Sequence, residues 1–198
     1  TAITEEDAVI TKHFCDSLSL VKGFSEIEKT VSLIDVGTGA GFPGIPLKIT
    51  FPHLKVTLLD SLNKRVRFLE EVCERLGLEN VTCVHARAED GGRNKDLREK
   101  FDLCVSRAVA NLSSLSEYCM PFVKVGGYFT AYKSGNIDEE LKASENAINK
   151  LGGKVECVYR FSLPQTDIER SIVFIKKIKN TAKKYPRRAG LPSKEPLN

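Results

Sequence analysis

The stretch SLIDVGTGAGFPG (32–44) constrains the fold of this chain more than any other, because a short apolar strand runs directly into a glycine cluster. Four glycines fall within the eight positions from Gly37 to Gly44. Glycine loses the most conformational freedom when a chain orders, so the cluster indicates a place where backbone without side chains is required. In a parallel α/β sheet, the loop after the first strand lies at the carboxyl edge, where ligands bind.

Beyond this loop, β-rich runs alternate with helix-patterned segments. The β-rich runs are 55–60, 81–86, 101–109 and 126–133, and the helix-patterned segments are 61–78, 112–123 and 138–152. Two further β-rich runs, 154–163 and 169–178, have no helix between them and are expected to pair antiparallel. This order predicts an α/β, Rossmann-like fold with a seven-stranded, mostly parallel sheet and an antiparallel C-terminal strand.

The two ends of the chain differ from its middle. We expect an N-terminal helix over 1–24, a main domain over 25–180 and a basic, proline-containing tail over 181–198. Thr4 is the candidate N-cap of the helix. The chain opens at Thr1 without a methionine, so part of a natural N-terminal region is expected to be missing. The net charge is +4, yet eight lysines and arginines against one acid lie in 176–198, which indicates either a polyanionic partner or a solvated tail.

Composition indicates the cellular compartment of the chain. No apolar run is long enough to cross a bilayer, and no secretory segment opens the chain. The six cysteines are scattered without C-x-x-C or zinc spacing, which indicates reduced thiols in a reducing compartment. We therefore expect a cytoplasmic protein with no membrane partner and no metal.

Two ligand-binding patterns compete for the glycine loop. Residues 39–44 fit the dinucleotide pattern G-x-G-x-x-G, which is a weak signal by itself. The wider pattern, Asp35 followed by Gly37, Gly39 and Gly41, is similar to that of S-adenosylmethionine-dependent methyltransferases. A carboxylate at the strand end suits an ammonium group, directly or through water, whereas it would repel a pyrophosphate. Asp60, at the end of the second strand, is placed to accept hydrogen bonds from ribose hydroxyls of either ligand.

Several longer motifs together resemble one family. They are HFCDSL, DVGTGAGFPGIPL, LLDSLNKRVRFL, ARAED, SRAVA, YKSG and KYPRRAGLPSKEPL. From about Lys12 to its end, the chain resembles the bacterial 16S ribosomal RNA guanine-N7 methyltransferases, also called the glucose-inhibited division protein B family. The resemblance implies S-adenosylmethionine as cofactor and methyl transfer to N7 of a guanine. It also implies that the partner is 16S ribosomal RNA or a small-subunit assembly intermediate.

The resemblance also implies a set of cofactor-binding residues. Together with the motif acid and glycines above, the expected set is Asp35, Gly37, Gly39, Gly41, Phe42, Asp60, Ser61, Leu62, Ala88, Glu89 and Arg107. Guanine N7 carries an exposed lone pair and no proton, so no general base is needed. Positioning and exclusion of water are expected to do most of the catalysis. No residue is assigned to the chemical step, for which Arg107 and Lys133 are the candidates.

The N7 edge of guanine faces the deep, narrow major groove of A-form RNA, so the target is expected to be looped out or flipped. The candidate RNA contacts are Lys133, Tyr185, Arg187, Arg188 and Lys194, with the tyrosine stacking on a base. The residues alone leave other functions open. These are a methyltransferase of another RNA, a small metabolite or a protein, a dinucleotide-dependent oxidoreductase, and an RNA-binding module that needs the cofactor only for folding.

Overall fold

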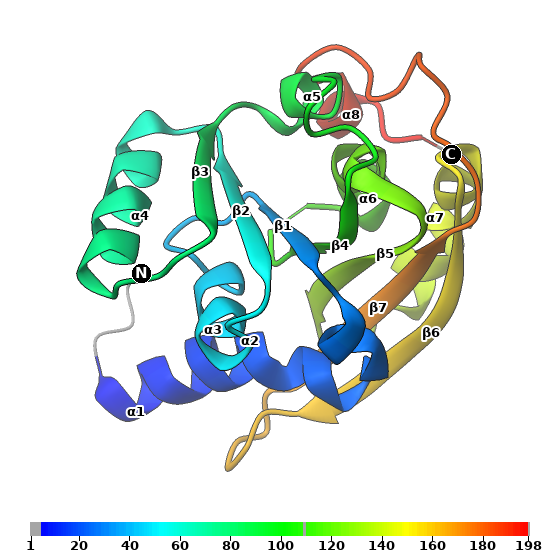
Figure 1. Cartoon of the computed structure of the whole chain (residues 1–198). Helices are drawn as coiled ribbons and strands as arrows, with labels where there is room; N and C mark the ends of the chain where they lie inside the picture. Colours follow the sequence, from blue (N-terminus) through cyan, green and yellow to red (C-terminus); the bar gives the residue numbers. More distant parts are fainter. Residues whose placement is uncertain (1–4, 109, 198) are drawn as a thin grey trace.

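The structure, a computed structural model, describes residues 5–108 and 110–197 of the chain. Its seven strands form one sheet in the order β3-β2-β1-β4-β5-β7-β6 (Figure 1). The strands are β1 (Ser32–Val36), β2 (Lys55–Asp60), β3 (Val81–His85), β4 (Phe101–Ser106), β5 (Val123–Ser134), β6 (Gly153–Ser162) and β7 (Glu169–Lys177). Strands β1 to β5 are parallel, and β7 pairs antiparallel with both β5 and β6. The predicted fold class is confirmed.

The strand order reverses between β1 and β4. From β1 the chain moves outward through β2 and β3, then returns to the other side of β1 with β4. Such a switch point leaves a crevice at the carboxyl ends of the two strands, because the connections leave in opposite directions. Both strands are almost wholly buried, as parallel strands covered on both faces must be. Strand β4 ends at Ser106, earlier than expected, and Val109 lies outside the described residues.

Helices cover both faces of the sheet. The helices are α3 (Gly44–Thr50), α4 (Asn63–Arg75), α5 (Ala88–Gly91), α6 (Leu112–Cys119), α7 (Asp138–Lys150) and α8 (Leu191–Lys194). On one face, α3 and α4 bury Leu47 and Leu69 against β1 and β2. On the other face, α6 and α7 bury Leu115 and Ile148. Helix α6 begins where predicted, with the Asn111 side chain accepting a hydrogen bond from the Ser113 amide.

The N-terminal segment forms a helical run across one end of the sheet (Figure 1). It consists of α1 (Glu6–Val9), a π-helical stretch η1 (Ile10–Cys15), α2 (Asp16–Leu18) and a 3₁₀ turn η2 (Ser19–Lys22). Short 3₁₀ turns η3 (Ser25–Lys29) and η4 (Met120–Phe122) follow later in the chain. The predicted cap Thr4 lies outside the described residues. In the part of the chain that the structure describes, no helix is both long and apolar enough to cross a bilayer.

The C-terminal tail, expected either to bind a polyanion or to be solvated, packs onto the domain beside α5 and α6 (Figure 1). Tyr185 is 7% exposed and belongs to the core, and Pro192 is buried. Lys177, one of the cations that made the end basic, is also buried, and burial lowers its pKa to about 8. Asn198 lies outside the described residues. Lys177 therefore adds no exposed positive charge to this region, because its side chain is buried.

Candidate functional site

The glycine loop after β1 has a backbone that only glycine adopts readily. Gly37, Gly39 and Gly41 have φ values of +72°, +62° and +96°. A Cβ at Gly41 would lie 2.4 Å from Ile45 Cδ1, so a larger residue there would displace the Ile45 side chain and strain a backbone with positive φ. A Cβ at Gly39 would meet nothing within 4 Å, and one at Gly37 would meet only Ala108. The first two glycines thus face open space, where a ligand can approach the backbone.

Asp35 fastens the two ends of this loop. The side chain is wholly buried, and its Oδ2 accepts hydrogen bonds from Thr38 Oγ1 (2.7 Å) and from the Gly44 amide (2.9 Å). Burial raises the pKa of Asp35 to about 6. The sequence led us to expect that this carboxylate suits an ammonium group, directly or through water. Its exposed fraction in the structure is 0%, and the ammonium contact stays a proposal. The other oxygen, Oδ1, is buried and accepts no hydrogen bond from the described residues.

This burial predicts a pH dependence of stability. The pKa of Asp35 rises from about 3.8 to about 6 on folding, so its proton contributes stability that is fully present below about pH 4 and lost as pH rises through 6. Between pH 4 and 7, we expect the free energy of unfolding of the wild type to fall by up to about 3 kcal/mol relative to Asp35→Asn. Urea unfolding at four pH values measures this difference. The exposed Asp96→Asn is the control, and a constant difference for Asp35→Asn would contradict the assignment.

Asp60 holds the loop from the neighbouring strand. It is 2% exposed, and its Oδ2 accepts a hydrogen bond from the Gly39 amide at 3.0 Å and contacts Arg65 at 3.3 Å. Its Oδ1 accepts a hydrogen bond from the Leu62 amide at 2.9 Å. Asp60 therefore shapes the loop, and these three contacts leave it one of the about four hydrogen bonds that a carboxylate can accept. Leu62, another predicted cofactor-binding residue, is 52% exposed. The predicted contact of Asp60 with ribose hydroxyls stays a proposal.

A cavity of about 340 Å³ lies over the carboxyl ends of β1, β2 and β3. We call it the β1–β3 cavity. Four of the predicted residues line it, namely Gly37, Ser61, Ala88 and Glu89. Among the lining residues that sequence reasoning missed are Tyr118 from α6 and Gly190 and Ser193 from the tail. No local pattern could have revealed them, because each reaches the cavity through packing between segments that are far apart in the chain.

Glu89 joins the cavity to the tail. Its side chain is largely buried, and Oε1 accepts a hydrogen bond from the Gly190 amide at 2.8 Å. Nearby, Ser114 Oγ donates to the Pro192 carbonyl at 2.7 Å, and Arg98 donates to the Tyr185 carbonyl at 2.8 Å. These contacts make the tail a fixed wall of the β1–β3 cavity.

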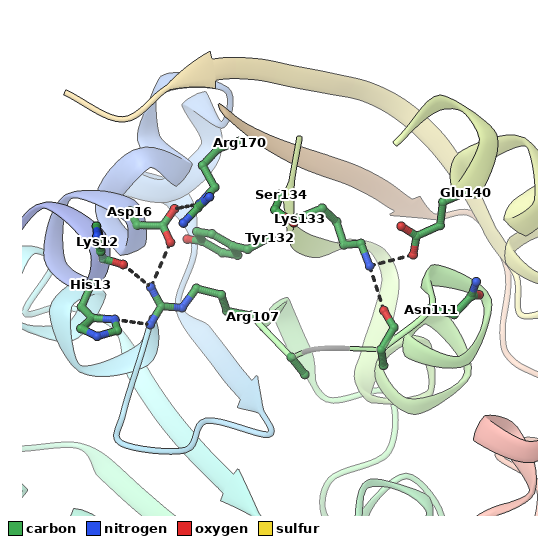
Figure 2. A pocket seen from close by; sticks show the side chains of 12 residues that line it. Lys12, His13, Asp16, Arg107, Asn111, Tyr132, Lys133, Ser134, Glu140 and Arg170 are labelled. Carbon is green, nitrogen blue, oxygen red and sulfur yellow. Dashed lines mark hydrogen bonds and ion pairs between the residues drawn. The ribbon is translucent and has the colours of Figure 1, made fainter. Parts of the chain in front are cut away.

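A second cavity, of about 680 Å³, lies over the carboxyl ends of β4 and β5. We call it the β4–β5 cavity (Figure 2). Its polar lining comes from the N-terminal helix, β5, α7 and β7, and includes His13, Asp16, Lys133, Glu140 and Arg170. Ala108 and Ala110 line both cavities, so the two are adjacent.

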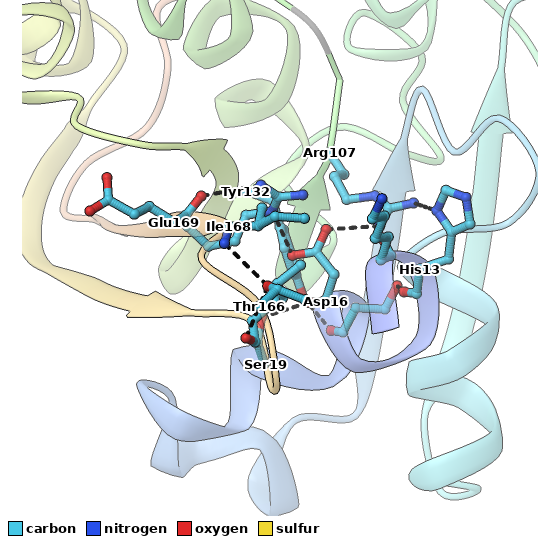
Figure 3. Close-up of polar contacts among 12 residues, drawn as sticks. His13, Asp16, Ser19, Arg107, Tyr132, Thr166, Ile168 and Glu169 are labelled. Carbon is cyan, nitrogen blue, oxygen red and sulfur yellow. Dashed lines mark hydrogen bonds and ion pairs between the residues drawn. The ribbon is translucent and has the colours of Figure 1, made fainter. Parts of the chain in front are cut away.

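Arg107 ties the N-terminal helix to the sheet (Figures 2 and 3). Its guanidinium donates to Asp16 Oδ2 at 3.0 Å and to the Lys12 carbonyl at 3.1 Å, and lies 3.1 Å from His13 Nδ1. It also lies 5.4 Å from the centre of the Phe42 ring, on which His13 stacks at 5.1 Å. Burial and the Arg107 charge lower the pKa of His13, which favours the neutral ring that can accept this hydrogen bond.

Two of the predicted RNA-contacting residues are exposed, and the other three are partly or wholly buried. Arg188 and Lys194 are exposed on the tail. Tyr185 is in the core, so no face of its ring is open to a base, and the structure does not support the stacking role. Arg187 is paired with the buried carboxylate of Glu117 at 2.7 Å, so it anchors the tail. Lys133 lies in the β4–β5 cavity and is mostly buried.

Comparison with known proteins identifies close relatives. The family model described as GidB, rRNA small subunit methyltransferase G, matches residues 1–173. The chain is 58% identical to the ribosomal RNA small subunit methyltransferase G of Lachnoclostridium phytofermentans, covering 100% of this chain and 81% of the relative. It is 56% identical to the protein of the same name from Alkaliphilus metalliredigens, covering 100% and 82%.

Solved structures show the same fold at low sequence identity. A putative sarcosine dimethylglycine methyltransferase from Galdieria sulphuraria has a TM-score of 0.62 at 11% identity, covering 83% of this chain and 84% of that one. M. jannaschii TYW2 in complex with AdoMet has a TM-score of 0.59 at 15% identity, covering 80% and 76%. These likenesses concern the fold alone.

Proposed function

The chain belongs to the GidB family of rRNA small subunit methyltransferase G, and we propose that it transfers a methyl group from S-adenosylmethionine to N7 of a guanine in 16S ribosomal RNA. It is an S-adenosylmethionine-dependent rRNA methyltransferase. The choice of atom and base is the proposed part. The observation that supports methyl transfer to a base is the pair of adjacent cavities, one for a cofactor and one for an acceptor beside it, and the choice of guanine N7 follows from the family resemblance. A cytoplasmic location belongs to the same proposal.

The residues of the β1–β3 cavity fit this cofactor. Gly37 and Gly39 hold open the space that side chains would fill, as close approach by a ligand requires. Asp35 lies beneath the same loop, and its buried Oδ1 accepts no hydrogen bond from the described residues, so a ligand ammonium would reach it through a water molecule or a shift of the loop. Ser61 and Glu89 supply hydrogen-bonding groups at the other strand ends. When bound, S-adenosylmethionine supplies an activated methyl group on a sulfonium sulfur.

The chain's own residues position the acceptor and exclude water. The N-terminal helix covers one side of the β4–β5 cavity, held there by the Asp16–Arg107 ion pair. Guanine N7 has no proton to lose, so the network needs no base, and His13 Nδ1 faces the Arg107 guanidinium. Shielding from water strengthens the electrostatic interactions in such a site. We propose that Arg107 acts by holding this cover in place.

The exposed tail cations support binding of a polyanion. Arg188 and Lys194 lie on the tail that walls the β1–β3 cavity, so phosphate groups that they bind would lie near the cofactor. The target base must leave its stack to enter the neighbouring cavity. A dinucleotide-dependent oxidoreductase, considered from the G-x-G-x-x-G match alone, is not supported by the family.

Transfer of a labelled methyl group tests the proposal. We expect small-subunit rRNA incubated with the protein and methyl-labelled S-adenosylmethionine to gain label at one guanine, at a site that borohydride and aniline then cleave as N7-methylguanine. Large-subunit rRNA is the control. Label on another atom or base, or in a small metabolite, would overturn the choice of guanine N7 and leave the methyltransferase class in place.

A further inference from the structure

Lys133 and Glu140 form an ion pair at the edge of the β4–β5 cavity. Lys133 comes from the end of β5 and Glu140 from the first turn of α7, and the Nζ–Oε1 distance is 2.7 Å. Their side chains are 12% and 25% exposed. Figure 2 shows the two charged groups facing each other. The pair is thus mostly removed from bulk water while lining the cavity.

The pair has hydrogen-bonding capacity that the protein does not use. Two of the three N–H groups of Lys133 are satisfied by Glu140 Oε1 and by the Ala110 carbonyl at 2.8 Å. The Leu112 amide also donates to Glu140 Oε1, at 2.6 Å. Among the described residues, these contacts leave one ammonium N–H and the second carboxylate oxygen for a ligand. The pair therefore offers one donor and one acceptor side by side.

Two other polar side chains of the cavity, Asp16 and Tyr132, are engaged within the protein. Both oxygens of Asp16 accept hydrogen bonds, one from Arg107 at 3.0 Å and one from Arg170 at 3.1 Å. The Tyr132 hydroxyl donates to the Ser17 carbonyl at 2.7 Å. Among the described carboxylates that line this cavity, Glu140 is therefore the one with an oxygen to offer to a bound base.

We propose that the Lys133–Glu140 pair recognises the acceptor guanine, with Lys133 donating to O6 and Glu140 accepting from N1–H. This inference rests on the proposed function. Next to N7 on the edge of guanine comes the O6 acceptor, and then the N1–H donor. The pair presents a donor and an acceptor in the matching order when N7 points toward the boundary at Ala108 and Ala110, which the β1–β3 cavity shares.

Adenine in the same position would be rejected. It presents an amino donor in place of O6 and a lone pair in place of N1–H. Lys133 would then face a donor, and Glu140 would face an acceptor. A site that leaves two mostly buried groups unpaired discriminates strongly, because both have lost their contact with water.

The same pair favours the reaction as well as the base. The N7 lone pair forms the new N–CH₃ bond, and the electrons of the broken S–CH₃ bond stay on sulfur. The purine therefore gains the positive charge that the sulfonium loses. This charge makes N1–H more acidic, so its hydrogen bond to the Glu140 carboxylate strengthens in the transition state. An interaction that strengthens in this way raises kcat.

Base analogues at the methylated position test the proposal with the wild-type protein. An RNA fragment is prepared with guanine, inosine or 2-aminopurine at that position. Inosine keeps O6 and N1–H, and 2-aminopurine keeps N7 but lacks both groups. We expect inosine to be methylated within about threefold of guanine, and 2-aminopurine at least about 100-fold more slowly. Comparable rates on guanine and 2-aminopurine would overturn the inference.

Two variants assign the roles. We expect Glu140→Gln to lower kcat on guanine about tenfold, since a neutral acceptor replaces a charged one. Its preference for guanine over 2-aminopurine should fall at least as much, because the amide can donate to N1 of the analogue. Lys133→Met should slow guanine and inosine but not 2-aminopurine, which has no O6. Glu139→Gln, exposed on the same turn, is the matched control.

The outcomes separate the inference from the function on which it rests. If the wild type methylates no guanine at N7, the proposed function fails. If it does so, and Glu140→Gln slows guanine and 2-aminopurine equally, Glu140 is structural and the inference fails alone. Titration with S-adenosylhomocysteine should give unchanged affinity for both variants. If Glu140→Gln does not fold, Lys133→Met and the wild-type analogue rates still decide the question.

Discussion

Asparagine in place of Gly37 is expected to weaken cofactor binding strongly while the protein stays folded. Gly37 lines the β1–β3 cavity with φ +72°, and a Cβ there would lie 3.7 Å from the Ala108 Cβ. The remainder of the side chain must then occupy the cavity. Asparagine tolerates the left-handed backbone, so the replacement adds bulk with little strain. We expect the Kd for S-adenosylhomocysteine to rise on the order of 100-fold or more, and methyl transfer to be lost.

Gly77 provides the matched control. Its φ is +59°, a Cβ there would meet nothing within 4 Å, and it follows α4 away from the cavity. Gly77→Asn therefore repeats the backbone change without filling the site. Calorimetric titration of both variants gives the affinities, and thermal unfolding shows that both fold. Equal affinities for Gly37→Asn and the wild type would mean that the cofactor does not lie at this loop.

Alanine in place of Arg187 is expected to destabilise the protein by about 3–5 kcal/mol, because it leaves a buried carboxylate unpaired. Glu117 has a side-chain exposure of 0% and accepts hydrogen bonds from Arg187 Nε, Nη2 and the backbone amide, at 2.7–3.0 Å. For a chain of this size, the expected fall in Tm is about 10 °C. Because the tail walls the β1–β3 cavity, the affinity for S-adenosylhomocysteine should fall as well.

The neighbouring Arg188 provides the control for the anchoring role of Arg187. It is exposed, so Arg188→Ala should change stability by less than about 0.5 kcal/mol. Urea unfolding of the two variants makes the comparison. Adding Glu117→Gln to Arg187→Ala should recover part of the lost stability, since it removes the stranded charge. A similarly small loss for Arg187→Ala and Arg188→Ala would show that the tail is not anchored by this pair.

Local patterns were sufficient to predict the seven strands and their mostly parallel pairing, although not their order in the sheet. Strands β1, β2 and β4 are short apolar runs, whereas β5 extends beyond the predicted 126–133 at both ends. The missing helix between β6 and β7 implied their antiparallel pairing. The glycine loop was placed correctly because the closely spaced glycines themselves indicate where the backbone must adopt positive φ. These features depend on contacts that are close in sequence or follow from general rules of sheet topology.

The roles of single charged residues were harder to predict, because they depend on partners far along the chain. Arg187 was expected to contact RNA, yet its partner Glu117 lies 70 residues earlier. Asp35 has the residue type expected at the strand end, but the loop that it fastens also buries it. The sequence of the tail indicated only that it is basic. Arg93 and Arg98 donate hydrogen bonds to carbonyl groups of the tail, and no sequence pattern predicted these contacts.

The central claim is that the β1–β3 cavity holds the cofactor with its donor end toward the β4–β5 cavity. A crystal structure of the protein with S-adenosylhomocysteine tests it most directly. We expect the adenine between Ala88–Glu89 and the Gly190–Ser193 wall, the amino-acid end at Gly37, and the sulfur facing the boundary at Ala108 and Ala110. An empty glycine loop, or a sulfur turned away from the β4–β5 cavity, would contradict the claim.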